Sequence, residues 1–171
     1  MKTIVAFKSK SGYTRQYAQW IAEELNCDIK EKPELSDIID YDTIICGGGM
    51  YAGGFNGIKL ITKNLDKLSG KKIVLFAVGS NPGREKEMTV FWDRILSKEQ
   101  QKKIGHFYLR GGFDFSKLTA GDKVLMKMLK IRLQSLKNPT EDEKEMLAAY
   151  DTPVDFSDKA NIKELIRFVL G

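Results

Sequence analysis

Cysteine and histidine are scarce in this chain. Cys27 and Cys46 are the only cysteines, they form no C-x-x-C pair, and the single histidine, His106, lies near neither of them in sequence. A zinc site needs clustered thiol and imidazole ligands, so we expect no metal site. We interpret both cysteines as structural thiols of a reducing compartment, the cytoplasm. His106 stands at the start of a predicted strand, where a structural or exposed role is favoured over a catalytic one.

Long apolar runs are also missing. The longest ones, such as Ile73–Val78, suit a strand and are far too short for a membrane span. Met1 and Lys2 lead directly into the first predicted strand, so we expect no signal peptide. The chain also lacks the motif G-x-x-x-x-G-K-[ST], which argues against a nucleoside triphosphatase.

The composition is that of a globular domain. A length of 171 residues, with 42% hydrophobic and 30% charged residues, suits a single domain over 1–171. The net charge of +5 is modest for this length. It is compatible with an anionic ligand, partner or surface without identifying one, and we expect no nucleic-acid partner.

Apolar runs alternate with helical patterns along most of the chain. Strands are predicted at 3–8, 28–31, 43–47, 72–79 and 106–109. Helices are predicted at 14–25, 58–68, 88–96 and 161–170, with helical turns at 34–39 and 98–103. This alternation predicts an α/β fold in which helices cover both faces of a parallel sheet. The polar run 28–31 is typical of a strand at the edge of a sheet.

The segment between the fifth strand and the last helix is much longer than a usual connection. We expect a helical insertion there, over about 112–158. Its first helix is predicted at Asp122–Leu136, and Thr140–Glu143 predicts the cap and acidic first turn of a second helix that ends near Tyr150. In the first helix, the apolar positions are Val124, Leu125, Met128, Leu129, Ile131, Leu133 and Leu136, and the polar positions are Lys123, Lys127, Lys130, Gln134 and Lys137.

The segment Ser9-Lys10-Ser11-Gly12-Tyr13-Thr14 joins the first predicted strand to the first predicted helix. Hydroxyls and backbone N–H groups converge in such a turn, and the partial positive charge of a helix N-terminus favours an anion. The segment contains no acidic residue, and Lys8, Lys10 and Arg15 add positive charge. It is therefore a candidate phosphate site. The alternative is an ordinary strand–helix turn in which Ser11 or Thr14 caps the helix.

The loops after the other strands are candidates for the rest of a ligand site, because ligands of parallel α/β sheets bind beyond the carboxyl ends of the strands. Gly47–Gly57 follows the third strand; its glycines allow a flat ligand to approach, and Met50 and Tyr51 offer apolar surface. Ser80–Arg84 follows the fourth strand and Gly111–Phe115 the fifth. Together with a phosphate site, these loops predict a mononucleotide that carries an aromatic ring, with FMN as the candidate.

A dinucleotide is the alternative ligand. The run Gly47-x-Gly49-x-x-Ala52 mimics the fingerprint G-x-G-x-x-G/A. However, it belongs to the third strand instead of the first, and no acidic residue stands at a suitable strand end about twenty residues later. We therefore favour a mononucleotide over NAD.

The segment Ser9–Thr14 resembles the phosphate-binding loop of flavodoxins, [ST]-x-T-G-x-T, with Ser11 in place of the central threonine. Within that superfamily, the chain is most similar to the branch that contains the quinone-dependent protoporphyrinogen oxidase of bacteria. This similarity covers nearly the whole chain. It runs through Thr14-Arg15, Tyr41-Asp42, the Tyr51/Gly53 loop and the helix that begins Asp122-Lys123.

The resemblance implies a flavodoxin-like, three-layer αβα fold with a five-stranded parallel sheet of order 2-1-3-4-5, and FMN as the cofactor. The implied phosphate site consists of Ser9, Lys10, Ser11, Gly12, Tyr13 and Thr14. The implied lining of the isoalloxazine ring consists of Gly49, Met50, Tyr51, Ala52 and Gly53. Another side of the ring would be closed by Ser80, Asn81, Pro82 and Gly83.

The resemblance also implies an FMN oxidoreductase that oxidises a porphyrinogen with a quinone as acceptor. The flavin carries the redox chemistry, so no acid–base side chain is required. One alternative is a flavodoxin-type electron carrier between protein partners, with no small-molecule substrate. The positive net charge disfavours it, because carriers are typically acidic around the flavin. The other is a flavin-less interaction module, which the hydroxyl-rich loop disfavours.

The basic helix Asp122–Lys137 has two interpretations. In the first, Lys123, Lys127, Lys130 and Arg132 dock an anionic membrane, porphyrin carboxylates or an acidic redox partner, and the protein lies at the inner face of the membrane. In the second, which we favour over membrane contact, the helix packs its apolar face on the domain and its lysines are solvated.

Overall fold

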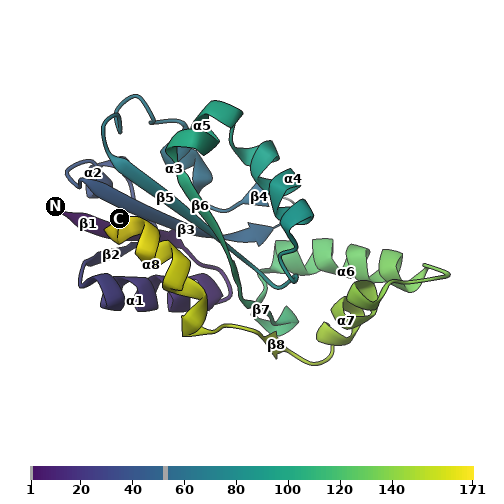
Figure 1. The fold of residues 1–171 in the computed structure, drawn as a ribbon. Coiled ribbons are helices and arrows are strands. Elements are labelled where there is room, and N and C mark those ends of the chain that lie inside the picture. The colour runs from purple at the N-terminus through teal and green to yellow at the C-terminus, as the bar shows by residue number, and fades with distance from the viewer. Residues whose placement is uncertain (1, 52–53) are drawn as a thin grey trace.

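A computed structural model describes residues 2–51 and 54–171 (Figure 1). The elements in chain order are β1 (Thr3–Lys8), α1 (Tyr13–Leu25), β2 (Asp28–Glu31), α2 (Leu35–Ile38), β3 (Thr43–Tyr51), β4 (Gly54–Phe55), α3 (Ile58–Thr62), β5 (Lys72–Gly79), α4 (Glu85–Ile95), α5 (Lys98–Lys103), β6 (Gly105–Arg110), β7 (Gly112–Phe113), η1 (Phe115–Lys117), α6 (Ala120–Gln134), α7 (Glu141–Ala149), β8 (Val154–Asp155), η2 (Lys159–Ile162) and α8 (Lys163–Leu170). Among these described residues, no helix has both the length and the apolar character needed to cross a membrane.

Five parallel strands form the central sheet in the order β2-β1-β3-β5-β6. Counted along the parallel strands, this is the predicted order 2-1-3-4-5, which is confirmed. The polar strand β2 lies at one edge, also as predicted. The short strand β4 pairs antiparallel with the end of β3, through Met50 with Phe55 and Tyr51 with Gly54.

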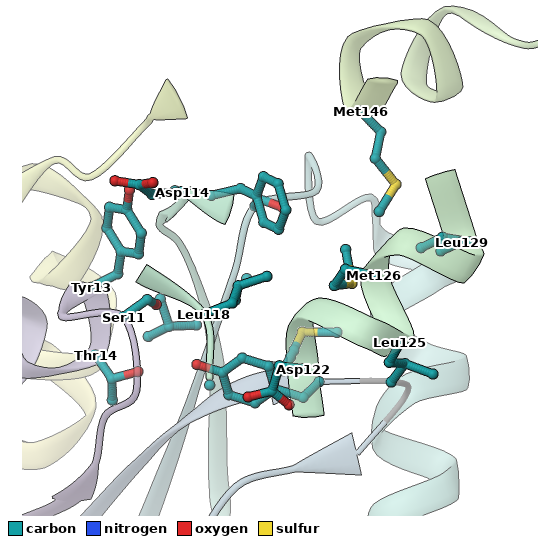
Figure 2. A pocket seen from close by; sticks show the side chains of 18 of the residues that line it. Ser11, Tyr13, Thr14, Asp114, Leu118, Asp122, Leu125, Met126, Leu129 and Met146 are labelled. Atoms are coloured by element: carbon teal, nitrogen blue, oxygen red, sulfur yellow. The ribbon is translucent and has the colours of Figure 1, made fainter. Parts of the chain in front are cut away.

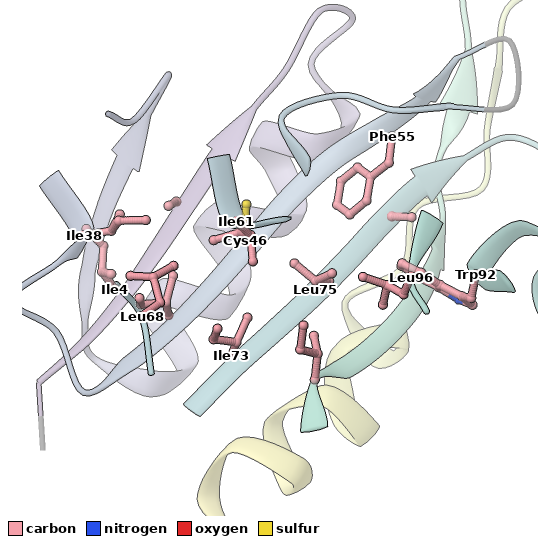
Figure 3. Packing of buried hydrophobic residues seen from close by; sticks show 14 of the residues in the cluster. Ile4, Ile38, Cys46, Phe55, Ile61, Leu68, Ile73, Leu75, Trp92 and Leu96 are labelled. Carbon is pink, nitrogen blue, oxygen red and sulfur yellow. The ribbon is translucent and has the colours of Figure 1, made fainter. Parts of the chain in front are cut away.

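Helices cover both faces of the sheet, as predicted. Side chains alternate along each strand, so Val5 and Ile4 point into different cores. One core lies under α1 and α8. The other lies under α2, α3 and α4 and contains Leu75 and Trp92 (Figure 3). Because both faces are buried, the central strands are nearly continuous apolar runs, which is why the sequence pattern reveals them.

The third strand is longer than predicted. It continues beyond Gly47 to Tyr51, because Gly47, Gly48 and Gly49 pair with β5 in the same register as the residues before them. The prediction of a loop from 47 onward was therefore wrong. A Cβ atom on Gly47 would lie 2.0 Å from Phe76 Cζ, and one on Gly48 would lie 1.9 Å from a backbone oxygen. The protein's own packing thus explains these two glycines.

The predicted helix 58–68 is shorter, and α3 ends at Thr62. The amide Nδ2 of Asn64 donates to the Leu60 carbonyl over 2.8 Å. Asparagine and aspartate side chains compete with the backbone for hydrogen bonds, so Asn64 and Asp66 favour turns over a continued helix. The last helix, predicted at 161–170, begins as the 3₁₀ turn η2, where the Asp158 side chain accepts from the Ala160 N–H. The helix predicted at 88–96 begins earlier, at Glu85.

The helical insertion leaves the domain after β6 and returns before η2. Its helices α6 and α7 project beyond the carboxyl ends of the strands (Figure 1). The short antiparallel pair β7–β8 joins its two ends. Both ends also meet at Tyr17, whose hydroxyl donates to the Arg110 carbonyl and accepts from Asp158 and Asn161.

We predict that Gly47→Ala lowers the free energy of unfolding by about 1–3 kcal/mol, because the added Cβ would overlap the fully buried Phe76 ring. Gly121→Ala in α6 is the matched control. Its added Cβ meets no atom within 4 Å, so we expect unchanged or slightly higher stability. Urea denaturation followed by circular dichroism measures both variants. Equal stability of the two would contradict this account of the glycine run.

Candidate functional site

A cavity of about 650 Å³ lies beyond the carboxyl ends of β1, β3 and β5, where the insertion covers the sheet (Figure 2). Seven of the predicted site residues line it: Ser11, Tyr13, Thr14, Gly49, Met50, Tyr51 and Ser80. Six more lining residues come from the strand ends and the start of the insertion: Val78, Gly79, Gly112, Phe113, Asp114 and Leu118. The remaining ones belong to α6 and α7: Asp122, Leu125, Met126, Met128, Leu129, Arg132 and Met146.

The loop Ser9–Gly12 leads into α1 through a left-handed residue. Gly12 has φ 97°, a conformation that glycine adopts without strain, and its N–H donates to Ser9 Oγ over 3.1 Å. No side chain caps α1, so the alternative in which Ser11 or Thr14 is the cap was wrong. Among the described residues, no acceptor takes up the N–H groups of Tyr13, Thr14 and Arg15. The start of this 13-residue helix can therefore receive an anion.

Thr14 is buried but lines the cavity, and its hydroxyl is bonded to none of the described residues. Ser11 lies next to it at the cavity wall (Figure 2). Ser9, Lys10 and Gly12 are not cavity-lining residues. Ser9 instead holds the backbone of the loop through Gly12. The structure thus brings two hydroxyls and the N-terminus of α1 to one end of the cavity.

The charge of this loop is more balanced than its sequence indicates. Lys10 Nζ donates to both carboxylate oxygens of Asp122 in α6, over 2.8 and 3.0 Å. Arg15 pairs with Glu31 over 2.8 Å. The loop itself contains no acidic residue, but the insertion brings the carboxylate of Asp122 to it. Hydrogen bonds from Lys10 and Thr119 hold the pKa of Asp122 below its usual range, so its carboxylate is charged at neutral pH.

Tyr51 covers the end of β3. Its ring packs on Gly49, where a Cβ would lie 2.5 Å from the ring, and Lys10 Nζ lies 4.7 Å from the ring centroid. Burial raises the pKa of its hydroxyl. Gly49 and Met50 also line the cavity. The predicted residues Ala52 and Gly53 lie outside the described residues.

The loop after β5 contributes less than predicted. Of Ser80–Gly83, only Ser80 lines the cavity. The carbonyl and side-chain oxygens of Asn81 accept from the Tyr108 hydroxyl over 2.6 and 2.7 Å. Gly83 has φ 72° and packs on the Tyr108 ring. Asn81 and Gly83 therefore hold the shape of this loop.

The sequence interpretation missed the apolar wall that the insertion builds. Leu125 and Leu129 of α6 and Met146 of α7 line the cavity (Figure 2). The signal for this wall is the apolar pattern of the helix predicted at 122–136, which we assigned to packing on the domain. The insertion is also tied to the loop after β5, because Arg84 pairs with Asp142 of α7.

The sequence of residues 4–141 matches the model of the family described as Flavodoxin domain. No curated protein matches the chain. Solved structures with a similar fold include oxidised flavodoxin 1 from Bacillus cereus, at 18% identity and a TM-score of 0.41, over 86% of this chain and 93% of that one. The Trp repressor binding protein from Bacillus subtilis has 14% identity and a TM-score of 0.44, over 64% and 83%.

A third structure is that of a flavoprotein in complex with FMN from Lactobacillus acidophilus NCFM. It has 17% identity and a TM-score of 0.39, over 64% of this chain and 92% of that one. The match to the family model spans well over half of the chain. The chain belongs to the flavodoxin-domain family.

Proposed function

We propose that this chain is an FMN-binding redox protein. The observation that carries the proposal is the start of α1, which no side chain of the described residues caps. Its free N–H groups lie beside Ser11 and Thr14, which line a cavity with apolar walls. A phosphate monoester fits the first feature, and a flat aromatic ring fits the second. FMN combines both in one molecule. We expect the protein to act in the cytoplasm.

When bound, FMN supplies the electron-transfer chemistry. In this proposal Thr14 and the first N–H groups of α1 hold the phosphate, while Ser9 keeps the loop in shape through Gly12. Met50, Tyr51 and the backbone at Gly49 form one wall of the ring site. The α6 side chains form another wall and exclude water from the ring.

The finer proposal is an oxidoreductase that takes electrons and protons from a porphyrinogen and passes them to a quinone. It is supported by the apolar wall of α6 and α7, because such a space suits a hydrophobic substrate beside the flavin. Arg132 lines the same cavity and offers a cation to a substrate carboxylate. The alternative is an electron carrier between proteins, which needs an accessible ring edge and no substrate space.

We predict that binding to the purified protein quenches the fluorescence of FMN. Thr14→Val should weaken this binding roughly tenfold or more. The substitution keeps the shape of the side chain and removes one hydrogen bond to a charged phosphate. Riboflavin lacks the phosphate, so its affinity should not change. Thr89→Val is the matched control, since Thr89 lies in α4 away from the cavity and its hydroxyl bonds the Glu85 carbonyl. Absence of FMN binding by the wild-type protein would refute the proposal.

A second prediction concerns Asp122. Its carboxylate pairs with Lys10 beside the phosphate loop, so Asp122→Asn should free Lys10 and remove a negative charge. We expect the preference for FMN over riboflavin to rise about two- to fivefold, and to fall in Lys10→Gln. Asp151→Asn is the control, because it breaks the Lys130–Asp151 pair elsewhere on the insertion. Fluorescence titrations at low salt give the ratio of the FMN affinity to the riboflavin affinity. If this ratio is unchanged in Asp122→Asn, the phosphate does not lie near Lys10.

The third prediction separates the enzyme from the carrier. We expect the FMN-loaded protein to oxidise protoporphyrinogen when a menaquinone analogue is the acceptor. Protoporphyrin fluorescence reports turnover, and heat-inactivated protein with free FMN is the control for spontaneous oxidation. Flavin binding without turnover would instead support a carrier and direct the search to protein partners.

A further inference from the structure

The outer face of α6 carries an apolar stripe that the rest of the described chain leaves uncovered. Val124, Met128 and Ile131 are 62%, 64% and 67% exposed, and helical spacing places them on one face. Leu125 lies beside this stripe. The opposite face contains Leu133, the one buried residue of α6. Scattered apolar side chains on a surface are ordinary, but a contiguous stripe marks an interaction surface.

Cationic side chains flank the stripe. Helical spacing places Lys127 along one side and Arg132 along the other, with Lys123 one turn before Lys127. The segment 120–137 contains five cationic residues and one acidic residue, Asp122, which is paired with Lys10. The ion pairs of the described residues include neither Lys123 nor Lys127.

The acidic helix α7 lies on another side of α6. The Tyr150 hydroxyl donates to the Met126 carbonyl over 2.7 Å, and Lys130 pairs with Asp151 over 3.1 Å. Lys130 therefore belongs to the contact between the two helices and is removed from the group of lysines that the sequence suggested for docking. The acidic side chains Asp142 and Glu141 pair with Arg84 and Lys144. The stripe itself faces away from α7.

We propose that α6 docks on the surface of a bilayer that contains anionic lipid. The helix would lie along the surface, with Val124, Met128 and Ile131 at the acyl-chain boundary and the flanking cations among the headgroups. Charge complementarity selects this occupant. A bilayer offers apolar depth and negative charge along the full length of a helix, whereas a protein partner needs a groove with acidic rims on both sides.

This docking deepens the proposed function, on which its purpose rests. Met128 of the stripe, and Leu125 and Arg132 beside it, also line the cavity. Docking would therefore bring the mouth of the cavity to the lipid, where a lipid-soluble electron acceptor is dissolved. The interaction with lipid itself requires only the outer face of α6.

The experiment is co-sedimentation of the 171-residue chain with vesicles of phosphatidylcholine, with and without phosphatidylglycerol. We expect binding to the anionic vesicles only, and weaker binding at high salt. Two double variants test the two parts of the surface. Val124→Ser with Ile131→Ser removes apolar surface, and Lys123→Gln with Lys127→Gln removes positive charge. None of these four residues lines the cavity. Each double variant should lower the partition coefficient between water and anionic vesicles roughly tenfold or more.

The matched control is Val90→Ser with Lys86→Gln on α4, where Val90 is 54% exposed. It should bind vesicles like the wild type. Lack of binding to anionic vesicles, or equal binding by all variants, would overturn the proposal. If size-exclusion chromatography without lipid shows a dimer that the serine variant loses, the occupant is a second copy of the chain and the proposal is also overturned.

FMN titration of the same samples keeps the two proposals apart. Protein that binds anionic vesicles but not FMN would refute the proposed function and leave the docking surface standing. Protein that binds FMN but no vesicles would refute the docking surface alone. Equal FMN affinity of the variants and the wild type would show that the substitutions leave the cavity intact.

Discussion

The position of the insertion depends on one buried hydroxyl. Tyr17 is fully buried in α1, and its Oη donates to the Arg110 carbonyl over 2.6 Å, where the chain leaves the sheet. The same oxygen accepts from the Asp158 N–H over 3.2 Å and from Asn161 Nδ2 over 2.9 Å, where the chain returns. Closing a long loop costs entropy that rises only slowly with its length, so fixing its two ends permits a large excursion. The length of the insertion is thus weakly constrained, whereas the positions of its two ends are fixed.

From that base the insertion reaches across the strand ends, and two ion pairs orient it. Lys10–Asp122 joins α6 to the loop after β1, and Arg84–Asp142 joins α7 to the loop after β5. These pairs are partly exposed, so each contributes little to stability. Their effect is geometric, because they hold the apolar side chains of α6 and α7 over the edge where an α/β sheet offers its ligand site. The sheet supplies the polar end of the cavity, and the insertion supplies its apolar walls.

The central fold could be predicted from the sequence because its signals are local. Ile73–Val78 and the other apolar runs are buried on both faces, so burial and strand coincide residue by residue. The glycine run that begins at Gly47 predicts a loop, but in the structure its glycines make room for Phe76, Phe55 and Tyr51. A glycine leaves space that either a ligand or a neighbouring side chain can fill. Only the three-dimensional structure shows which of the two fills it. The Lys10–Asp122 pair, 112 positions apart, has no local signal at all.

The interpretation of α6 failed for a related reason. Its apolar residues were assigned to one buried face, yet Leu133 is the one buried residue, while Leu129 lines the cavity and Ile131 is exposed. A helix whose apolar residues served the cavity alone would need them on one side only. Val124 and Ile131 are on the side that neither the cavity nor α7 covers, and side chains that are mostly exposed give the folded chain little burial energy. Their presence beside unpaired lysines is explained if a second environment, apolar at its centre and anionic at its edge, covers that side.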